Sequence, residues 1–373
     1  MQTRTPTTPA TGATRATAGP DAPRVPAAEQ SAPNVSGDGG DAPGAEPGSE
    51  PSVGPRRAWL SSLSSKYALV AVWIAMTVTY LAIMPDKFGR ISSIQSIFGS
   101  QQLLVFLAMA ALSTLIVGEF DLSVASVMGL AATVIPVLNN THGLSLWLSC
   151  VIGVGAAVAC GVVNAFFIVG LGVPSLVVTL GSGTLFIGIA ELFAGAGAVS
   201  IVPSNGFRNI TQYQLWGMPI CFWYGLVLVA AFAYVCACTP LGRHLMFVGA
   251  NREVARLAGI RVNRIRAGSY IMAGFLAGLA AVVLVSSVGG FNPTDAATYL
   301  LPTLAAVFLS TAVVQPGQFN AVGTIIGIYF LETGIFGLQL LGLSGWIQDV
   351  FYGGGLVFAV ALATIVRQRA KSA

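Results

Sequence analysis

Charged side chains are scarce in this chain of 373 residues, because Asp, Glu, Lys and Arg together account for only 9% of it. Soluble domains carry about 25% charged residues, so the composition argues against an ordinary soluble enzyme. Hydrophobic residues make up 55% of the chain, and its mean hydropathy is +0.78. The sequence therefore predicts a protein that lies mostly within a membrane.

Patterns that bind phosphate or metal are also missing. None of the three lysines follows a glycine, which excludes the Gly-Lys-Ser/Thr segment of a P-loop. His142 and His244 lie far apart, so no His-x-x-x-His pair indicates a zinc protease. Cys236 and Cys238 are too close together for a Cys-x-x-Cys redox pair. We therefore expect no cofactor, metal, catalytic or nucleic-acid site in this chain.

The first 55 residues contain no Leu, Ile, Phe, Trp or Tyr and are rich in Pro, Gly, Ala, Ser and Thr. Such a segment cannot bury enough apolar surface to offset the entropy lost on ordering, so 1–55 is predicted to be a disordered cytoplasmic tail. No apolar run typical of a signal peptide precedes Tyr67. Two interpretations of the tail stay open: a solvated extension, or an upstream start codon chosen in error.

Ten apolar segments follow within 56–373, the predicted transmembrane domain. A helix needs about 20 residues to cross the bilayer core, and a helix satisfies its own backbone hydrogen bonds there. The sequence therefore predicts an all-α polytopic membrane protein. One segment is long enough to tilt or to contain an interfacial turn. The segments, of which 144–170 is that long one, are 67–84, 99–117, 122–138, 144–170, 174–195, 219–238, 267–288, 298–314, 319–341 and 346–366.

Basic residues gather in three places and predict the orientation of the spans. The largest loop, 239–266, holds six arginines against the single acid Glu253. Two further clusters flank the first and last spans, and loops rich in Lys and Arg stay in the cytoplasm. Ten crossings that begin inside place all three clusters and both termini in the cytoplasm. The flanking residues are Arg56, Arg57, Lys66, Arg367, Arg369 and Lys371.

Within this loop, residues 250–259 are predicted to form a short helix. Asn251 is a suitable N-cap, Glu253 places a negative charge in the first turn, and Gly259 suits a C-terminal stop. A basic helix on the cytoplasmic side can bind anionic lipid headgroups or a partner protein. Spacing alone leaves both roles open.

Three motifs together resemble a known family. The segment Glu253-Val254-Ala255-x-x-x-Gly259 resembles the Glu-Ala-Ala-x-x-x-Gly loop of bacterial ABC importer permeases, with Val at the second position. The segment Gly118–Val124 is similar to the Gly-Asp-Leu-Ser-Val element of ribose- and xylose-type permeases, and Pro174–Gly181 to their Pro-x-x-x-x-Thr-Leu-Gly segment. The match runs in order over roughly residues 67–366.

The resemblance implies the permease subunit of a type II ABC importer for a monosaccharide or similar neutral polyol. Implied partners are a second copy or a homologous permease, ATP-binding subunits that carry ATP and magnesium, and an extracytoplasmic solute-binding protein. The 250–259 helix would dock into the ATP-binding subunit. Alternatives are a branched-chain amino-acid or nucleoside permease and, more distantly, a secondary transporter. The docking residues would be Asn251, Arg252, Glu253, Ala255, Arg256 and Gly259.

Several positions depart from the family pattern. The usual Gly-Gly before Asp-Leu-Ser-Val-Gly reads Glu119-Phe120 here, and Ala125 replaces the last Gly. The Gly-rich segment expected near 309–318 is absent, and Ile335-Phe336 stands where an Asn pair is common. These departures bear on which solute is transported more than on whether the protein is an importer permease.

Ionisable side chains within a membrane cost roughly 2.5–3.5 kcal/mol each and usually mark a function. Glu119 and Asp121 lie at a break between two apolar runs, where Asp121 could cap the next helix, line the solute path, or do both. Glu332 and Gln339 share a helix face and could line the pore or bond another helix. The predicted translocation residues are Glu119, Asp121, Ser123, Thr179, Glu332 and Gln339.

Glycines four residues apart allow two helices to approach closely. Gly274 and Gly278 form one such pair, and Gly323 and Gly327 form another. Both pairs are predicted to be helix-packing sites.

Overall fold

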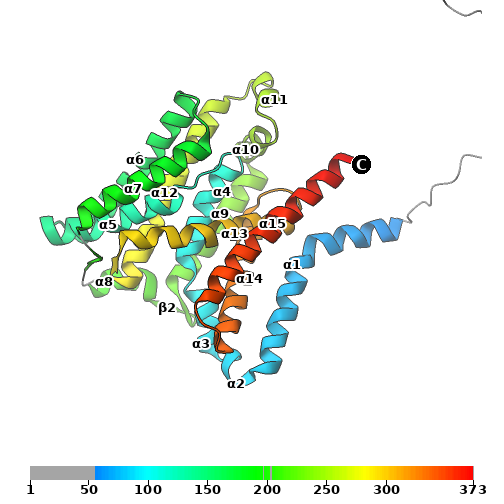
Figure 1. The fold of residues 1–373 in the computed structure, drawn as a ribbon, viewed down its shortest axis with the longest axis horizontal. Helices are drawn as coiled ribbons and strands as arrows, with labels where there is room; N and C mark the ends of the chain where they lie inside the picture. The colour runs from blue at the N-terminus through cyan, green and yellow to red at the C-terminus, as the bar shows by residue number, and fades with distance from the viewer. Residues whose placement is uncertain (1–54, 196, 202–203, 373) are drawn as a thin grey trace, which may run out of the picture. The chain divides into compact units, whose positions relative to one another are not determined.

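The computed structural model describes residues 55–195, 197–201 and 204–372, with side chains described for 67–195, 197–201 and 204–361. The described part is nearly all helical (Figure 1), which confirms the predicted all-α class. The predicted tail, 1–55, lies outside the described residues apart from its last residue, so its boundary stays a prediction. The side chains of the two flanking basic clusters also lie outside the described part, and the predicted orientation stays a prediction.

Eight helical segments of the described residues are long and apolar enough to cross a membrane. Two shorter apolar helices, Tyr67–Ile83 and Trp346–Ala361, coincide with the first and last predicted spans. The prediction of a polytopic membrane protein is therefore confirmed, whereas the count of ten crossings stays a prediction. The eight segments are Ile91–Leu115, Val124–His142, Leu146–Gly170, Ser175–Ala194, Ile220–Cys238, Val262–Val288, Pro293–Ala312 and Ala321–Leu340.

Local signals separate the helices of the first half. Gly143 ends one helix with a φ of 63°, and the Ser145 hydroxyl caps the next by accepting from the Leu148 amide. The long segment at 144–170 does contain an irregular turn, because its last residues form the π-helical turn η2. The elements are α1 (Pro55–Ile83), α2 (Pro85–Phe88), α3 (Ile91–Ile94), η1 (Gln95–Gly99), α4 (Gln102–Leu115), α5 (Val124–His142), α6 (Leu146–Ala165), η2 (Phe166–Gly170) and α7 (Ser175–Ala194).

Capping side chains also mark the start of helices in the second half of the chain. Asn320 caps α14 by accepting from the Gly323 amide at 2.6 Å, and its own amide group donates to the carbonyls of Ser310 and Val313. The elements are β1 (Val199–Ser200), α8 (Asn205–Gln212), β2 (Gln214–Leu215), β3 (Met218–Pro219), α9 (Ile220–Cys238), α10 (Pro240–Ala250), α11 (Arg252–Leu257), α12 (Val262–Val288), β4 (Gly290–Phe291), η3 (Pro293–Tyr299), α13 (Leu300–Leu309), η4 (Ser310–Ala312), α14 (Ala321–Leu340) and α15 (Trp346–Ser372). The two small antiparallel sheets pair β1 with β4 and β2 with β3.

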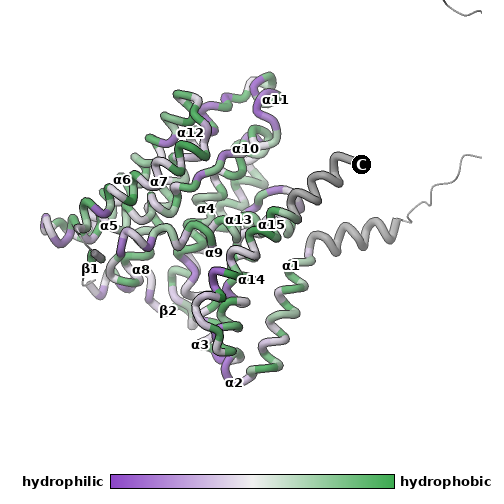
Figure 2. Tube along the Cα trace, in the orientation of Figure 1, coloured by the Kyte–Doolittle hydropathy of each residue, from purple (hydrophilic) through white to green (hydrophobic). Residues whose placement is uncertain are grey.

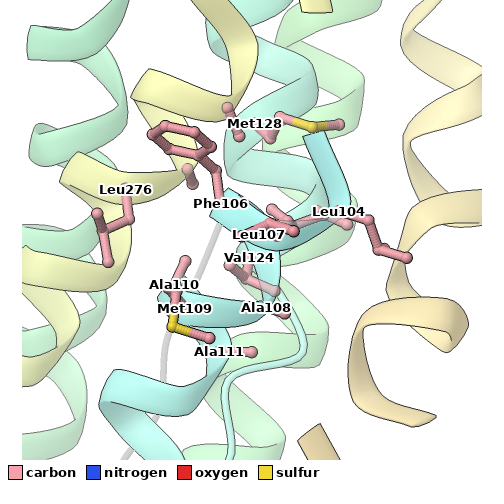
Figure 3. Close-up of a cluster of buried hydrophobic side chains, with 14 of the residues drawn as sticks. Leu104, Phe106, Leu107, Ala108, Met109, Ala110, Ala111, Val124, Met128 and Leu276 are labelled. Carbon is pink, nitrogen blue, oxygen red and sulfur yellow. The ribbon is translucent and has the colours of Figure 1, made fainter. Parts of the chain in front are cut away.

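Helix α4 lies at the centre of the largest apolar core. All but one of its residues are buried. Figure 3 shows Leu104–Ala111 of α4 beside Val124 and Met128 of α5 and Leu276 of α12. A helix that is apolar on every face is expected to be surrounded by other helices rather than by lipid alone.

Helices α6 and α12 cross at very short range because glycines line the contact. A Cβ on Gly274 would overlap the carbonyl oxygen of Ala157, and one on Gly278 would lie 3.0 Å from the Cα of Val154. A Cβ on Gly161 of α6 would likewise overlap the carbonyl oxygen of Tyr270. The structure thus places the first predicted glycine pair directly against a neighbouring helix.

The second predicted glycine pair faces the hairpin that joins α13 and α14. A Cβ on Gly323 would lie 2.8 Å from the carbonyl oxygen of Ser310, and one on Gly327 would lie 2.8 Å from that of Ala306. Both contacts are tighter than ordinary van der Waals distance. The hairpin therefore leaves no room for larger side chains.

The loop between α9 and α12 is shorter than predicted. The segment 239–266 contains the helix α10 as well as α11, and α12 begins at Val262 rather than at 267. Thr239 caps α10, with Pro240 as its first helical residue, a pattern that favours a helix start. In Figure 1, α11 lies at one end of the helices, whereas α3, α8 and β2 lie at the other. Figure 2 shows hydrophilic and hydrophobic residues side by side around α11.

The α6–α12 crossing can be tested with Gly274→Ala. The higher helix propensity of alanine stabilises the helix by about 1 kcal/mol relative to glycine. The overlap of the new Cβ with the Ala157 carbonyl oxygen is expected to destabilise the protein by about 1–3 kcal/mol. We expect a lower melting temperature for the detergent-solubilised protein. Gly268→Ala is the matched control, because a Cβ at Gly268 of the same helix meets no atom within 4 Å. Equal melting temperatures for the two variants would contradict the close crossing.

Candidate functional site

The predicted short helix is present as α11, and its caps form as the sequence indicates. The Asn251 side-chain oxygen accepts from the amides of Glu253 at 3.0 Å and Val254 at 3.1 Å. Gly259 has a φ of +79°, a left-handed value that glycine tolerates best. The helix is shorter than the predicted range 250–259, because Ala250 belongs to α10 and the last helical residue is Leu257.

The two faces of α11 differ. Ala255 is fully buried in a small apolar cluster with Val117, Val248 and Val262. The side chain of Leu257 is 88% exposed, although it is apolar. Val254 is also exposed, as are Glu253 and Arg256, which form an ion pair at 3.1 Å. The exposed face of α11 thus combines two apolar side chains with an ion pair.

Arg252 does not share the exposed face. Its Nη2 donates to the Gly118 carbonyl at 2.9 Å and lies 2.8 Å from Glu119 Oε1. Arg266 of α12 donates from Nε to the same carboxylate oxygen at 2.6 Å, and the Tyr270 hydroxyl lies 3.4 Å from the other oxygen. We call Glu119, Arg252, Arg266 and Tyr270 the Glu119 cluster. It joins the α11 loop to the break between α4 and α5.

Burial makes the Glu119 cluster sensitive to the loss of a partner. The Glu119 side chain is only 2% exposed, so its charge needs compensation within the protein. Removing one partner of a buried ion pair typically costs about 3–5 kcal/mol, because the other charge is left uncompensated. Arg266 still pairs with the carboxylate when Arg252 is changed, so loss of Arg252 is expected to cost less than loss of Glu119.

A second buried polar group lies next to this cluster. Asp121 Oδ1 accepts from the amide of Ser123 at 2.9 Å and from its hydroxyl at 2.6 Å, directly before α5 begins. The Ser123 hydroxyl in turn accepts from the Asn164 side chain of α6 at 2.8 Å. Burial raises the pKa of Asp121, and its bonds from Ser123 oppose that rise. Asp121 therefore forms a turn at the start of α5 and does not line the cavity described below.

Thr179 also lies away from that cavity. It is fully buried within α7, and its hydroxyl donates to the Ser175 carbonyl one turn earlier at 2.8 Å. This bond satisfies the hydroxyl locally, so the structure places Thr179 in helix packing.

A polar cavity of about 1290 Å³ opens at the other end of the helices from α11. It reaches the last residues of α12, whereas α11 adjoins the first. Six glutamines and several hydroxyl groups line it, together with the carboxylates of Glu332 and Asp349, and no Lys, Arg or His lines it among the residues with described side chains. Its polar lining includes Ser92, Gln95, Ser96, Ser100, Gln101, Gln102, Thr211, Gln212, Gln214, Ser287, Thr298, Tyr299, Gln348 and Tyr352.

The structure separates the two polar residues predicted on α14. Glu332 lines the cavity, is nearly buried, and accepts a short hydrogen bond from the Tyr352 hydroxyl of α15. Gln339 is exposed and does not line the cavity. Seven residues advance a helix by about 10 Å, so Gln339 lies beyond the cavity lining even though it shares the Glu332 face.

Sequence reasoning missed three features of these sites. The inward turn of Arg252, its pairing with Glu119, and the glutamine-lined cavity all depend on contacts between distant segments. The exposed anchor Leu257 had a signal, since Val254 and Leu257 are three residues apart and share a helix face opposite buried Ala255.

Apolar helices of membrane-spanning length, an exposed capped helix and a polar cavity together define a multi-pass transport protein. A family model described as "Branched-chain amino acid transport system / permease component" matches residues 93–360. The chain belongs to this family, and the predicted resemblance to importer permeases is confirmed. It is a multi-pass permease of the cytoplasmic membrane, and ATP hydrolysis in such a system belongs to a separate subunit. The family also implies a solute-binding protein.

Among the relatives are autoinducer 2 import system permease proteins LsrC. That of Salmonella typhi is 28% identical over 300 residues, which cover 79% of this chain and 86% of the relative. That of Photorhabdus laumondii is 30% identical over 283 residues, which cover 76% and 84%. That of Escherichia coli strain SMS-3-5 is 29% identical over 290 residues, with the same coverage of 76% and 84%. No solved structure matches the chain significantly.

The cap of α11 can be tested with Asn251→Ala. Losing the cap is expected to destabilise the helix by about 1 kcal/mol, because two amides lose their acceptor. Hydrogen exchange of a peptide covering 251–259 should therefore become faster. Asn251→Asp keeps a side-chain oxygen and should exchange like the unchanged protein. Equal exchange in the alanine variant would show that the cap contributes nothing.

Proposed function

We propose that this chain is the translocating subunit of an ATP-driven importer for a small, neutral, hydroxylated solute such as a monosaccharide or polyol. The observation that supports it best is the lining of the polar cavity, which combines amides and hydroxyls with two carboxylates and contains no basic side chain. Amides and hydroxyls both donate and accept hydrogen bonds, as the hydroxyls of such a solute require.

Glu332 is the residue that we expect to contact the solute most strongly. Its carboxylate lines the cavity, and the Tyr352 hydroxyl donates a hydrogen bond to one of its two oxygens. The other oxygen has capacity for a solute hydroxyl, and a hydrogen bond to a charged acceptor is stronger than one between neutral groups. Of the predicted translocation residues, Glu332 then belongs to the solute pathway. Glu119, Asp121 and Ser123 act at the break near α11, and Thr179 acts in helix packing.

The relatives and the family description point to different solutes. LsrC proteins are named as importers of autoinducer 2, whereas the family description names branched-chain amino acids. An amino acid is a zwitterion, so its ammonium group suits Glu332 and Asp349 but its carboxylate finds no basic partner in the described lining. A neutral hydroxylated solute needs no such partner, so the lining favours it.

The exposed face of α11 supports docking of the ATP-binding subunit, so we call α11 the docking helix. Leu257 and Val254 supply an apolar anchor, and the Glu253–Arg256 pair adds charge beside it. Asn251 and Gly259 end the helix sharply on both sides, which keeps it rigid. Ala255 is buried, and the half-exposed Arg252 is engaged with Gly118 and Glu119, so their role in docking is indirect.

The proposed assembly follows the family resemblance. Two permease subunits, identical or homologous, would bind two ATP-binding subunits in the cytoplasm and receive solute from a binding protein outside. Closure of the ATP-binding subunits would move the docking helix and shift the spans between outward and inward openings. The polar cavity would then be the outward opening.

The proposed solute class can be tested by uptake into cells that express the importer with its ATP-binding subunit and solute-binding protein. We expect ribose, xylose or autoinducer 2 to accumulate and leucine neither to accumulate nor to compete. Glu332→Gln keeps the acceptor for Tyr352 but loses the charge, so uptake should fall by about tenfold, equivalent to about 1.4 kcal/mol.

Gln339→Ala is the control for that variant, because Gln339 lies on the same helix outside the cavity. Its uptake should match that of the unchanged protein. Accumulation of leucine instead of the hydroxylated solutes would favour the branched-chain amino-acid alternative. Normal uptake by Glu332→Gln would remove this residue from the pathway.

Docking can be tested with Leu257→Ala. Removing an exposed apolar anchor should weaken binding of the ATP-binding subunit by at least about tenfold, because such anchors often contribute 2 kcal/mol or more. The measurement is the affinity of the purified subunit for the permease in nanodiscs. Leu192→Ala is the control, since Leu192 is 80% exposed at the far end of α7. Equal affinities for both variants would place docking elsewhere.

A further inference from the structure

Residues that belong to or adjoin the three sequence motifs lie at or beside the Glu119 cluster. Glu119 belongs to the Gly118–Val124 motif, and Arg252 directly precedes the Glu253–Gly259 motif. Tyr270 of α12 approaches the Glu119 carboxylate and is itself fully buried beside Val178 of the Pro174–Gly181 motif. Segments that lie far apart in the sequence therefore share one buried ionic site.

Arg252 is the residue that connects this site to the docking helix. Its guanidinium contacts both the Gly118 carbonyl and the Glu119 carboxylate, so it holds the backbone and the side chain of the break. Among the residues with described side chains, this is the one ion pair between α11 and the rest of the protein. Ala255 adds an apolar contact to Val117 on the same side.

From the break, polar contacts continue into three spans. Asp121 and Ser123 form the turn that starts α5, and Ser123 accepts from Asn164 of α6. Arg266 attaches the same oxygen of the Glu119 carboxylate to α12, and the Tyr270 hydroxyl of α12 lies near the other oxygen. Polar contacts and the backbone of the break therefore connect α11 to α5, α6 and α12, so a displacement of α11 can be transmitted to these spans.

We propose that Glu119 is a positioning residue that transmits displacement of the docking helix to these spans through its ion pair with Arg252. The inference rests on the proposed function, in which α11 docks the ATP-binding subunit. Arg252 holds both the Gly118 carbonyl and the Glu119 carboxylate, so a movement of α11 that keeps these two contacts moves the break with it. Arg266 and Tyr270 carry the same displacement into α12.

The experiment measures hydrogen exchange of residues 118–123 in full-length permease in nanodiscs, with and without the purified ATP-binding subunit. In the unchanged protein, exchange should slow by about fivefold or more on binding, the low end of typical coupling between sites. In Arg252→Gln this protection should disappear although the subunit still binds, because the exposed face of α11 is intact. Arg252→Lys keeps the charge and should restore part of the protection.

Arg264→Gln is the matched control, because it removes an equal charge from an exposed position two residues before Arg266. It should keep the full protection. Failure of the unchanged permease to bind the ATP-binding subunit would overturn the proposed function. Binding without protection at 118–123, or protection that persists in Arg252→Gln, would overturn the role of Glu119 and leave the proposed function standing.

Discussion

The buried charge of Glu119 is the constraint on which the docking end of this permease depends. A carboxylate that is 2% exposed has to be compensated within the protein, and here two arginines from different segments do so. One of them belongs to α11 and the other to α12. The same requirement therefore attaches the loop around α11 to α12 and to the break between α4 and α5.

Helix α12 connects the two ends of the molecule. It has 27 residues and is thus about 40 Å long, enough to reach from one side of a bilayer to the other. Its first turns carry Arg266, its middle crosses α6 at Gly274 and Gly278, and its last turns line the polar cavity. The tight glycine crossing leaves little freedom for the two helices to slide independently. A shift at one end is accordingly expected to appear at the other.

Much of the fold could be predicted because it depends on local signals. Apolar runs of about 20 residues located the spans, and Asn251 and Gly259 located the ends of the docking helix. The site residues were harder, because their roles depend on tertiary contacts. Helix spacing placed Glu332 and Gln339 on one face but said nothing about how far the cavity extends along it. Likewise, no local pattern reveals that Gln95 and Gln348 line the same cavity.

The scarcity of charge also explains why the two ends differ chemically. Two of the basic residues in or beside the loop around α11 compensate Glu119, and the part of the cavity lining that the structure describes contains no basic residue. A cation there would attract anionic solutes and would also cost free energy at membrane depth when no solute is bound. Amides carry no such cost once they are hydrogen-bonded, as Gln95 and Gln212 are to backbone carbonyls. A cavity built from amides and hydroxyls can therefore stay hydrated, bind a neutral solute weakly and release it when the spans move.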